Sequence, residues 1–422
     1  RSLFFALAIV PAAAQAQADP QSQESEPTLP AEQLVAEGTT LSGEDWRVET
    51  PVPVRGFLGQ FVIQSRWGPI DAQGRELLDL RIAELDALEQ LDALSHTDVF
   101  AGAIADSALA TGAAIGRVVT RPVETVRGVP AGIGRLIRRT ASSARKLAVT
   151  VGDTARRTLE ESDQDNDASD GTEKVKNFAN ELAGVNKARR DLAREIGIDP
   201  YTRNPLIQQR LEKMACAAVA GGMSMDLMMA QIGGGAADIL SASRKIDGLV
   251  WDLPPGDIRR QLEARLVDRG IEDVAARDFL RNGTFTPTLQ VEFVDAMEAL
   301  GRPSGEPGLI ALAETIRSEV HARFLIQQLQ MLASNVPEDD PITEIVPFEA
   351  SIGALSRSGD LWIMLPVDYL SWSETANLVA AKDDDPPSHL VIAGETSERA
   401  RAELERAGWS VKAGVGLADP NR

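Results

Sequence analysis

Residues 388–413 read SHLVIAGETSERARAELERAGWSVKA, and this stretch decides the fold prediction for the C-terminal part of the chain. The apolar run His389–Ala393 is typical of a buried strand. Ser397–Ala407 has the charged, Ala-rich composition of a helix, and Trp409–Ala413 suits a second strand. The order strand, helix, strand predicts a βαβ unit, in which the two strands lie parallel.

A hairpin is predicted immediately before this unit. Thr343–Ala354 and Asp360–Val367 are both apolar, and the residues between them, Ser356–Asp360, include a glycine and polar side chains typical of a turn. Together with the βαβ unit, the hairpin predicts a small α+β domain over residues 341–416.

The rest of the chain has mostly helical periodicity. Apolar residues recur on one face of residues 75–94, at Leu78, Ile82, Leu85, Leu88 and Leu91. Residues 174–335 are predicted to form an α-helical domain, with helices that include 287–300 and 308–334. Only residues 47–68, rich in Val and Phe, indicate strands, and we expect two short ones. The predicted fold class is a mainly α-helical multi-domain protein with a small C-terminal α+β domain.

The composition excludes several classes of protein. Acidic residues outnumber basic ones by 63 to 43 over 422 residues, and the resulting charge of −20 argues against nucleic-acid binding by the whole chain. With one Cys and three His, the chain has neither a disulfide framework nor a Cys-rich zinc module. We therefore expect no cofactor and no metal site, and no residue is singled out as catalytic.

The first 46 residues have the composition of a targeting segment and a leader. Residues 1–18 begin with Arg1, continue with an apolar stretch and end in small residues at Ala14, Ala16 and Ala18, which is the pattern of a signal peptide. We therefore predict export to the periplasm or the extracellular space. Residues 19–46 are acidic and rich in Gln, Ser and Pro, so we expect a disordered leader there.

A basic segment, residues 100–157, contrasts with the acidic chain. From Arg117 to Arg157 ten Lys and Arg residues face only Glu124 and Asp153, so the local charge is +8. Apolar residues in its middle recur at helical spacing, which is typical of an amphipathic helix. We expect residues 47–157 to combine short strands and helices with this segment. An acidic linker, residues 158–173, follows with seven acids and no base.

An amphipathic basic helix can lie in the interface of an anionic bilayer. Each Lys or Arg near such a surface contributes on the order of 1 kcal/mol. We predict that the basic segment contacts an anionic lipid surface or an acidic protein partner. The residues expected to bind that surface are Arg117, Arg121, Arg127, Arg135, Arg138, Arg139, Arg145 and Lys146. Nucleic acid is disfavoured because residues 101–157 have no aromatic side chain on which a base could stack. The alternative is a packed helical hairpin whose arginines pair with acids of residues 75–98 and 158–173.

Motifs for catalysis or metal binding are weak. Asp163 begins a stretch that looks like a calcium loop, but Ala168 takes the place of the turn glycine and Lys174 that of the bidentate Glu. The three histidines, at 96, 321 and 389, are too widely separated for a histidine metal motif. The many acids leave open a carboxylate pair of the kind that cleaves glycosides or peptidoglycan.

These observations predict an exported, non-enzymatic cell-envelope protein. It would associate peripherally with an anionic membrane or an acidic partner through the basic segment. One alternative is a periplasmic hydrolase of cell-wall material, with its site in a cleft between the helical and α+β domains. The other is a structural assembly subunit, whose oligomeric state the sequence does not give.

Overall fold

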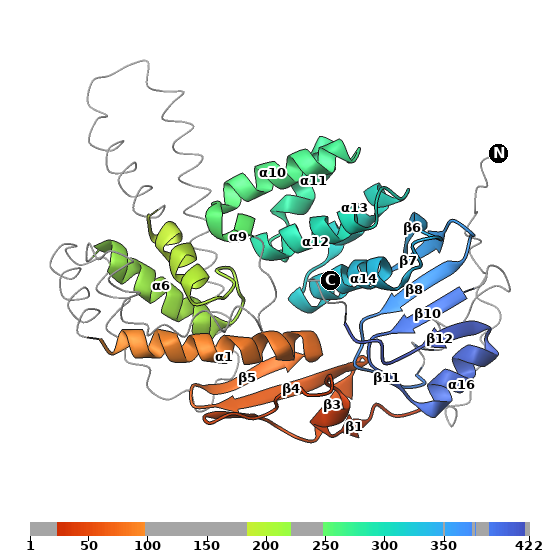
Figure 1. Cartoon of the computed structure of the whole chain (residues 1–422), viewed down its shortest axis with the longest axis horizontal. Coiled ribbons are helices and arrows are strands. Elements are labelled where there is room, and N and C mark those ends of the chain that lie inside the picture. The colour runs from red at the N-terminus through yellow and green to blue at the C-terminus, as the bar shows by residue number, and fades with distance from the viewer. Residues whose placement is uncertain are drawn as a thin grey trace, which may run out of the picture.

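The computed structural model describes residues 23–97, 184–220, 248–348, 351–373, 376 and 388–417. In these residues a sheet near the N-terminus and a sheet near the C-terminus are connected by a layer of helices (Figure 1). The predicted signal peptide, the basic part of segment 100–157 and the acidic linker all lie outside the described residues.

The N-terminal sheet has five strands, each antiparallel to its neighbours: β1 (Thr28–Leu29), β2 (Trp46–Val48), β3 (Val52–Arg55), β4 (Leu58–Ser65) and β5 (Gly68–Gln73). β4 pairs with β2, β3 and β5 and buries every second residue, including Phe61 and Ile63. The sequence predicts only two strands here. Turns of two residues separate β3, β4 and β5, so they hardly interrupt the apolar pattern.

Helix α1 (Arg75–Ser95) covers this sheet, and the helix predicted over 75–94 is confirmed. Its leucines, among them Leu78 and Leu88, share one core with Phe61 and Ile63. Each fully buried leucine contributes about 2 kcal/mol from the area it removes from water. The helical residues 184–195 and α6 (Pro205–Ala220) complete that core with apolar side chains such as Leu192.

The described part of the expected disordered leader, residues 23–46, has ordered contacts. It includes β1 and a 3₁₀ turn, η2 (Ala31–Gln33), and it buries Ala31 and Leu34 in the N-terminal core. Glu24 accepts a hydrogen bond from the Trp372 N–H at 2.6 Å, so this segment also contacts the C-terminal part. Composition misses this arrangement because a few apolar residues, among them Ala31 and Leu34, are enough to hold an otherwise polar segment against the core.

Residues 248–335, all described, form six helices: α9 (Gly248–Asp252), α10 (Pro255–Asp268), α11 (Asp273–Arg281), α12 (Pro287–Ala299), α13 (Glu306–Thr315) and α14 (Glu319–Asn335). The helix predicted over 287–300 is confirmed as α12. The single helix predicted over 308–334 is wrong, because the backbone is extended at Ile316 and Ser318. Ser318 then caps α14 by accepting a hydrogen bond from the His321 N–H at 3.2 Å.

The C-terminal sheet has the strand order β12-β10-β8-β7-β6. Its strands are β6 (Ile342–Phe348), β7 (Ser351–Ser356), β8 (Leu361–Leu365), β10 (Ser388–Ile392) and β12 (Trp409–Lys412). β10 lies parallel to both β8 and β12, and α16 (Glu398–Arg406) connects β10 to β12, so the βαβ prediction is confirmed. The predicted hairpin forms from β7 and β8, but its first apolar segment, Thr343–Ala354, contains two strands. A small parallel pair, β9 (Tyr369–Leu370) and β11 (Glu395–Thr396), lies beside it.

The predicted fold class is wrong. Sheets of five strands occur in both the N-terminal and the C-terminal parts, with a third sheet of two strands, so the protein is not mainly α-helical with a small C-terminal α+β domain. The helices α10–α14 share one core with the C-terminal sheet, in which Leu289 and Leu325 pack with Ile345 and Ile352. Strands of two to eight residues give a weak periodic signal, whereas the long helices dominate the sequence pattern. The domain boundaries given above stay predictions.

Candidate functional site

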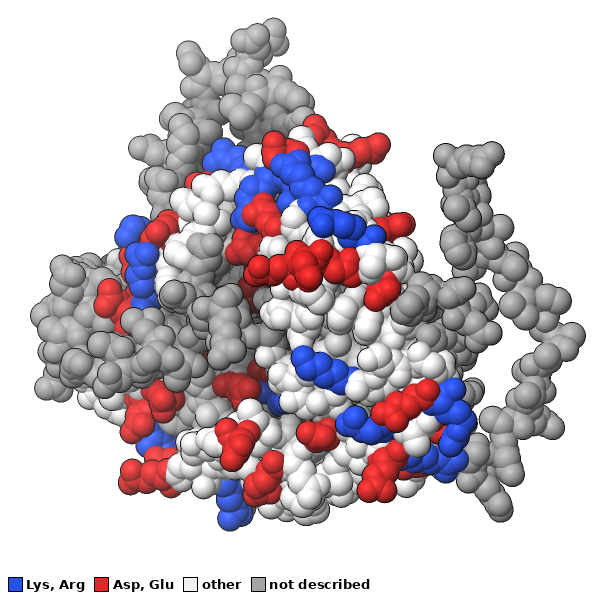
Figure 2. Space-filling model, turned by 45° about the vertical axis from the view of Figure 1, so that its right-hand side comes forward, with Lys and Arg blue, Asp and Glu red and all other residues white. Residues whose placement is uncertain are grey.

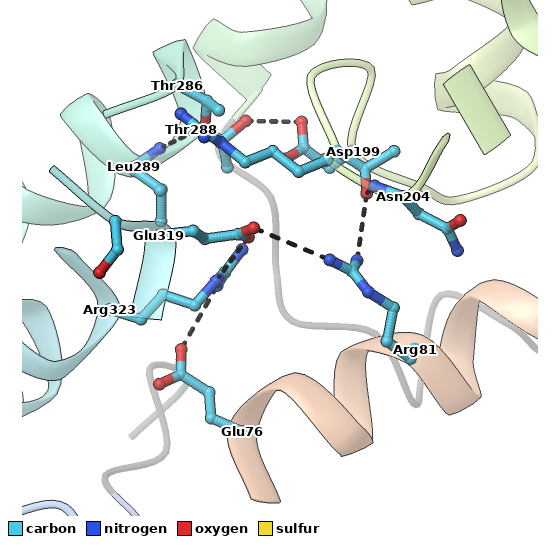
Figure 3. Close-up of polar contacts among 12 residues, drawn as sticks. Glu76, Arg81, Asp199, Asn204, Thr286, Thr288, Leu289, Glu319 and Arg323 are labelled. Carbon is cyan, nitrogen blue, oxygen red and sulfur yellow. Dashed lines mark hydrogen bonds and ion pairs between the residues drawn. The ribbon is translucent and has the colours of Figure 1, made fainter. Parts of the chain in front are cut away.

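A buried group of charged residues lies where α1 meets α14. Figure 3 shows Glu76 and Arg81 on α1 and Glu319 and Arg323 on α14. Glu84 also belongs to α1. Thr202 and Asn204 reach the same place from the loop before α6. We call these seven residues the α1–α14 cluster.

Arg323 is the centre of the cluster. Its Nη1 lies 3.3 Å from Glu76 Oε1 and its Nε donates to Glu319 Oε1 at 3.0 Å. Only 7% of its side chain is exposed. Burial disfavours the charged form, but the negative charges of Glu76, Glu292 and Glu319 raise the pKa of Arg323 above its ordinary value. The guanidinium therefore stays charged and joins α14 to α1.

Arg81 extends the cluster along α1. Its Nη1 lies 2.9 Å from Glu84 Oε2, and its Nη2 lies 3.8 Å from Glu319 Oε2. The buried carboxylate of Glu84 also accepts hydrogen bonds from Asn204 Nδ2, at 2.8 Å, and from the Thr202 hydroxyl. Positive and negative groups thus alternate from Glu76 to Asn204, which is the condition under which buried charges are tolerated.

Asp199 lies beside the cluster and faces α12. Its Oδ1 accepts hydrogen bonds from the Thr288 hydroxyl at 2.6 Å and from the Tyr201 N–H at 2.8 Å. Burial raises the pKa of this carboxyl to about 6, and the two hydrogen bonds oppose that shift only in part. A proton on Oδ2 leaves both accepted bonds in place.

The Asp199→Asn variant is expected to show how much the ionisation of this carboxyl changes the free energy of unfolding with pH. The folded pKa exceeds the ordinary value of an Asp, so the native state binds the proton more tightly than the unfolded state. The stability that Asp199 contributes is therefore fully present at low pH and decreases as the pH rises towards 6. Above that pH it changes no further. Between about pH 4.5 and 7.5 the wild type should lose about 2 kcal/mol relative to the variant.

Urea unfolding of both proteins across this pH range measures that difference. The half-exposed Asp257, replaced by Asn, is the matched control and should show a much smaller change. A constant difference between wild type and Asp199→Asn at all pH values would contradict the assignment.

A pocket opens next to the cluster, at the beginning of α1. It brings together Gln73, Gly74, Arg75, Glu76 and Asp368 with Arg323 and an apolar wall. Asp368 closes one side of the pocket: its Oδ2 accepts the Gly59 N–H at 2.7 Å and its Oδ1 accepts the Arg75 N–H at 3.1 Å. Burial raises the pKa of Asp368 to about 6. We call this hollow the α1 pocket.

Asp368 also fixes the two sheets to each other. Its backbone N–H donates to the carbonyl of Phe57, in the β3–β4 turn, and its own carbonyl accepts from the Glu395 N–H. A side chain at Gly394 would meet this carbonyl, since an added Cβ would lie 2.0 Å from the Asp368 oxygen. The cluster and the pocket therefore form the joint between the N-terminal and C-terminal parts.

The residues predicted to bind an anionic surface are not placed by the structure. Arg117, Arg121, Arg127, Arg135, Arg138, Arg139, Arg145 and Lys146 all lie outside the described residues. The sequence interpretation did not single out the cluster. In the sequence, the cluster is visible only as two charge pairs at helical spacing, Arg81 with Glu84 and Glu319 with Arg323. Such pairs usually lie on a solvated helix surface.

Comparisons with known proteins give no information on the function. No protein-family model matches the chain, and no curated protein or solved structure matches it either. Among the described residues, no group of three or more His, Cys, Asp or Glu is arranged to hold a metal ion. Within those same residues, no helix has the length and apolar character needed to cross a membrane.

Proposed function

We propose that this is an exported, non-enzymatic cell-envelope protein that binds an anionic membrane surface peripherally through its basic segment. The observation that carries the proposal is the contrast between a local charge of +8 and a chain charge of −20. A cationic amphipathic segment favours a negative surface, because each Lys or Arg near that surface contributes on the order of 1 kcal/mol and this attraction opposes the repulsion of the anionic body.

Arginines of the described body support this assignment by their pairing. Arg265 contacts Asp295 at 2.6 Å and Glu298 at 2.7 Å, and Arg302 contacts Asp268 at 2.5 Å. On the face drawn in Figure 2, Lys and Arg side chains lie next to Asp and Glu in the same way. Such pairs have much of their charge compensated within the protein, so the basic segment is the stronger candidate for binding a negative surface.

Both flanks of the segment are held by one core. Leu94, at the end of α1, and Leu192, in the helical residues 184–195, belong to the same buried cluster. The described residues on the two sides of the segment, up to 97 and from 184, therefore contact the same core. A segment tied at both ends would bring the whole body to the surface that it binds.

A hydrolase of cell-wall material is the second candidate, because the α1 pocket brings Glu76 and Asp368 to one hollow at the joint. Their contacts favour the first candidate. Asp368 accepts two backbone N–H groups and Glu76 is paired with Arg323, so both carboxylates already have structural partners. Peptidoglycan cleavage that is lost in the Glu76→Gln variant, with the fold retained, would instead favour the hydrolase.

Vesicle co-sedimentation of the full-length protein tests the proposal. We expect binding at low salt to vesicles that contain phosphatidylglycerol and much weaker binding to phosphatidylcholine alone. Added salt should release the protein, because screening weakens contacts between exposed charges. Equal recovery with both kinds of vesicle at low salt would rule out the electrostatic interaction.

A further inference from the structure

Three helical segments of the N-terminal core meet at one end of the molecule. The cluster contacts join the beginning of α6 to the middle of α1, and further along both helices Arg210 Nε donates to Asp92 Oδ1 at 2.8 Å, so α1 and α6 run in the same direction. The helical residues 184–195 begin beside the end of α6, since a Cβ added at Gly184 would lie 3.6 Å from the Val219 side chain. The last turns of α1 and α6 and the first turn of residues 184–195 therefore lie at the same end.

Beyond the pair of Asp92 and Arg210, the described residues at this end contain no Asp or Glu. They are residues 93–97, 184–190 and 213–219, and we call them the basic end. Its formal charge is +4, whereas the whole chain carries −20. The four basic residues are Lys187, Arg189, Arg190 and Lys213.

Contacts of the basic end leave much of this positive charge in place. The side chain of Lys187 is 71% exposed, and its only printed ion pair, with Asp191 at 2.7 Å, is of the exposed kind that water screens strongly. Arg190 is buried and donates to the backbone carbonyls of Asn186 and Trp251, each 3.2 Å away. Carbonyls are neutral acceptors, so these contacts do not cancel the charge of the guanidinium.

The basic segment is joined to the basic end on both sides. Residues 98–183, which contain the segment, follow residue 97 and precede residue 184, and both of these belong to the basic end. Attraction between exposed charges falls off within a Debye length, about 10 Å at 0.1 M salt, so only the side of the body that faces a membrane contributes to binding. The segment and the basic end are placed to act on the same negative surface.

We infer that the protein binds an anionic membrane with the basic end of its body against the lipid headgroups and with α16 on the side that faces away. This inference rests on the proposed function, because the basic segment supplies most of the attraction and the basic end sets the orientation. α6 and α16 lie on opposite sides of the molecule (Figure 1). α1 alone, with 21 residues at about 1.5 Å each, is about 30 Å long, so the two sides differ clearly in their distance from the membrane.

A fluorescent label on each side of the full-length protein tests this orientation. Lys187→Cys and Arg406→Cys are each made in a Cys216→Ala background, so that every protein has a single thiol. Both are mixed with phosphatidylglycerol vesicles that carry a contact quencher on their headgroups. We expect quenching at position 187 to be at least about threefold stronger than at position 406, because α16 lies farther from the bilayer than the length of α1.

Charge reversal tests the same orientation without a label. Lys187→Glu and Arg406→Glu are matched, since each replaces an exposed base of a helix. The two bases pair with an acid of their own helix, Asp191 and Glu403 respectively. At about 0.1 M salt the Lys187 variant should bind phosphatidylglycerol vesicles about 30-fold more weakly than the wild type, because it removes one base and adds one acid at the surface, and the Arg406 variant should stay within about threefold.

The outcomes separate this inference from the proposed function. Circular dichroism shows whether each variant is folded. If the wild type binds the vesicles but quenching is equal at the two positions, or the two folded charge variants bind equally well, the orientation is overturned while the basic segment remains the binding site. Absence of wild-type binding to phosphatidylglycerol vesicles would overturn both.

Discussion

Replacing Arg323 by Ala is expected to lower the free energy of unfolding by about 3–5 kcal/mol. The substitution removes the guanidinium that contacts Glu76 at 3.3 Å and Glu319 at 3.0 Å. Both carboxylates are largely buried, so each would lose its partner in a place where water replaces it poorly. Ala would also leave a cavity between α1 and α14. Urea unfolding at neutral pH measures the loss as a lower midpoint.

Two comparisons separate a buried charge from general loss of packing. Arg277→Ala breaks an ion pair of similar length, 3.1 Å to Glu263, but both side chains are more than a quarter exposed, and the loss should stay below about 1 kcal/mol. In the triple variant Arg323→Met, Glu76→Gln, Glu319→Gln the two carboxylates that Arg323 contacts become neutral together with it, so much of the stability should return. A loss in Arg323→Ala no greater than in Arg277→Ala would show that the cluster does not stabilise the joint.

Those parts of the fold that depend on local pattern could be predicted from the sequence. The leucines of α1 recur at helical spacing, and the apolar and charged segments of residues 388–413 alternate as a βαβ unit requires. Both predictions are confirmed because one helix face or one short strand is enough to define each element. The sequence also predicts where α12 ends, because Gly301 lies directly after the last turn and has a positive φ of 77°, which glycine adopts readily.

Other features depend on contacts between distant residues, and the sequence pattern does not contain them. Asp368 accepts the Gly59 N–H across 309 positions of the chain, and Glu84 accepts from Asn204 across 120. Arg323 looks like a solvated helical residue by its spacing from Glu319, but packing of α14 against α1 buries it. The cluster and the α1 pocket therefore could not be predicted, and the N-terminal sheet was underestimated because its pairing depends on short turns.

Neutralising three arginines of the basic segment is expected to weaken binding to anionic vesicles by about 100-fold. The variant is Arg135→Gln, Arg138→Gln, Arg139→Gln, which lie in the part of the segment with the strongest helical spacing of apolar residues. Each basic residue near an anionic surface contributes on the order of 1 kcal/mol, so three of them amount to about two orders of magnitude in affinity. The same positions changed to Lys keep the charge and should retain most of the binding.

A matched control distinguishes the segment from the net charge of the protein. Arg260, Arg281 and Arg302 lie in the described body with side chains 77%, 72% and 61% exposed, and their replacement by Gln changes the net charge by the same amount. If a negative surface is bound by the basic segment, this body variant should bind anionic vesicles within about threefold of the wild type.

The affinity of these two triple variants for phosphatidylglycerol vesicles, measured side by side at low salt, is the most direct test of the account. Binding through the basic segment predicts about a 100-fold loss for the segment variant and little change for the body variant. Equal affinity of the two variants, whether both bind or both fail to bind, would contradict it.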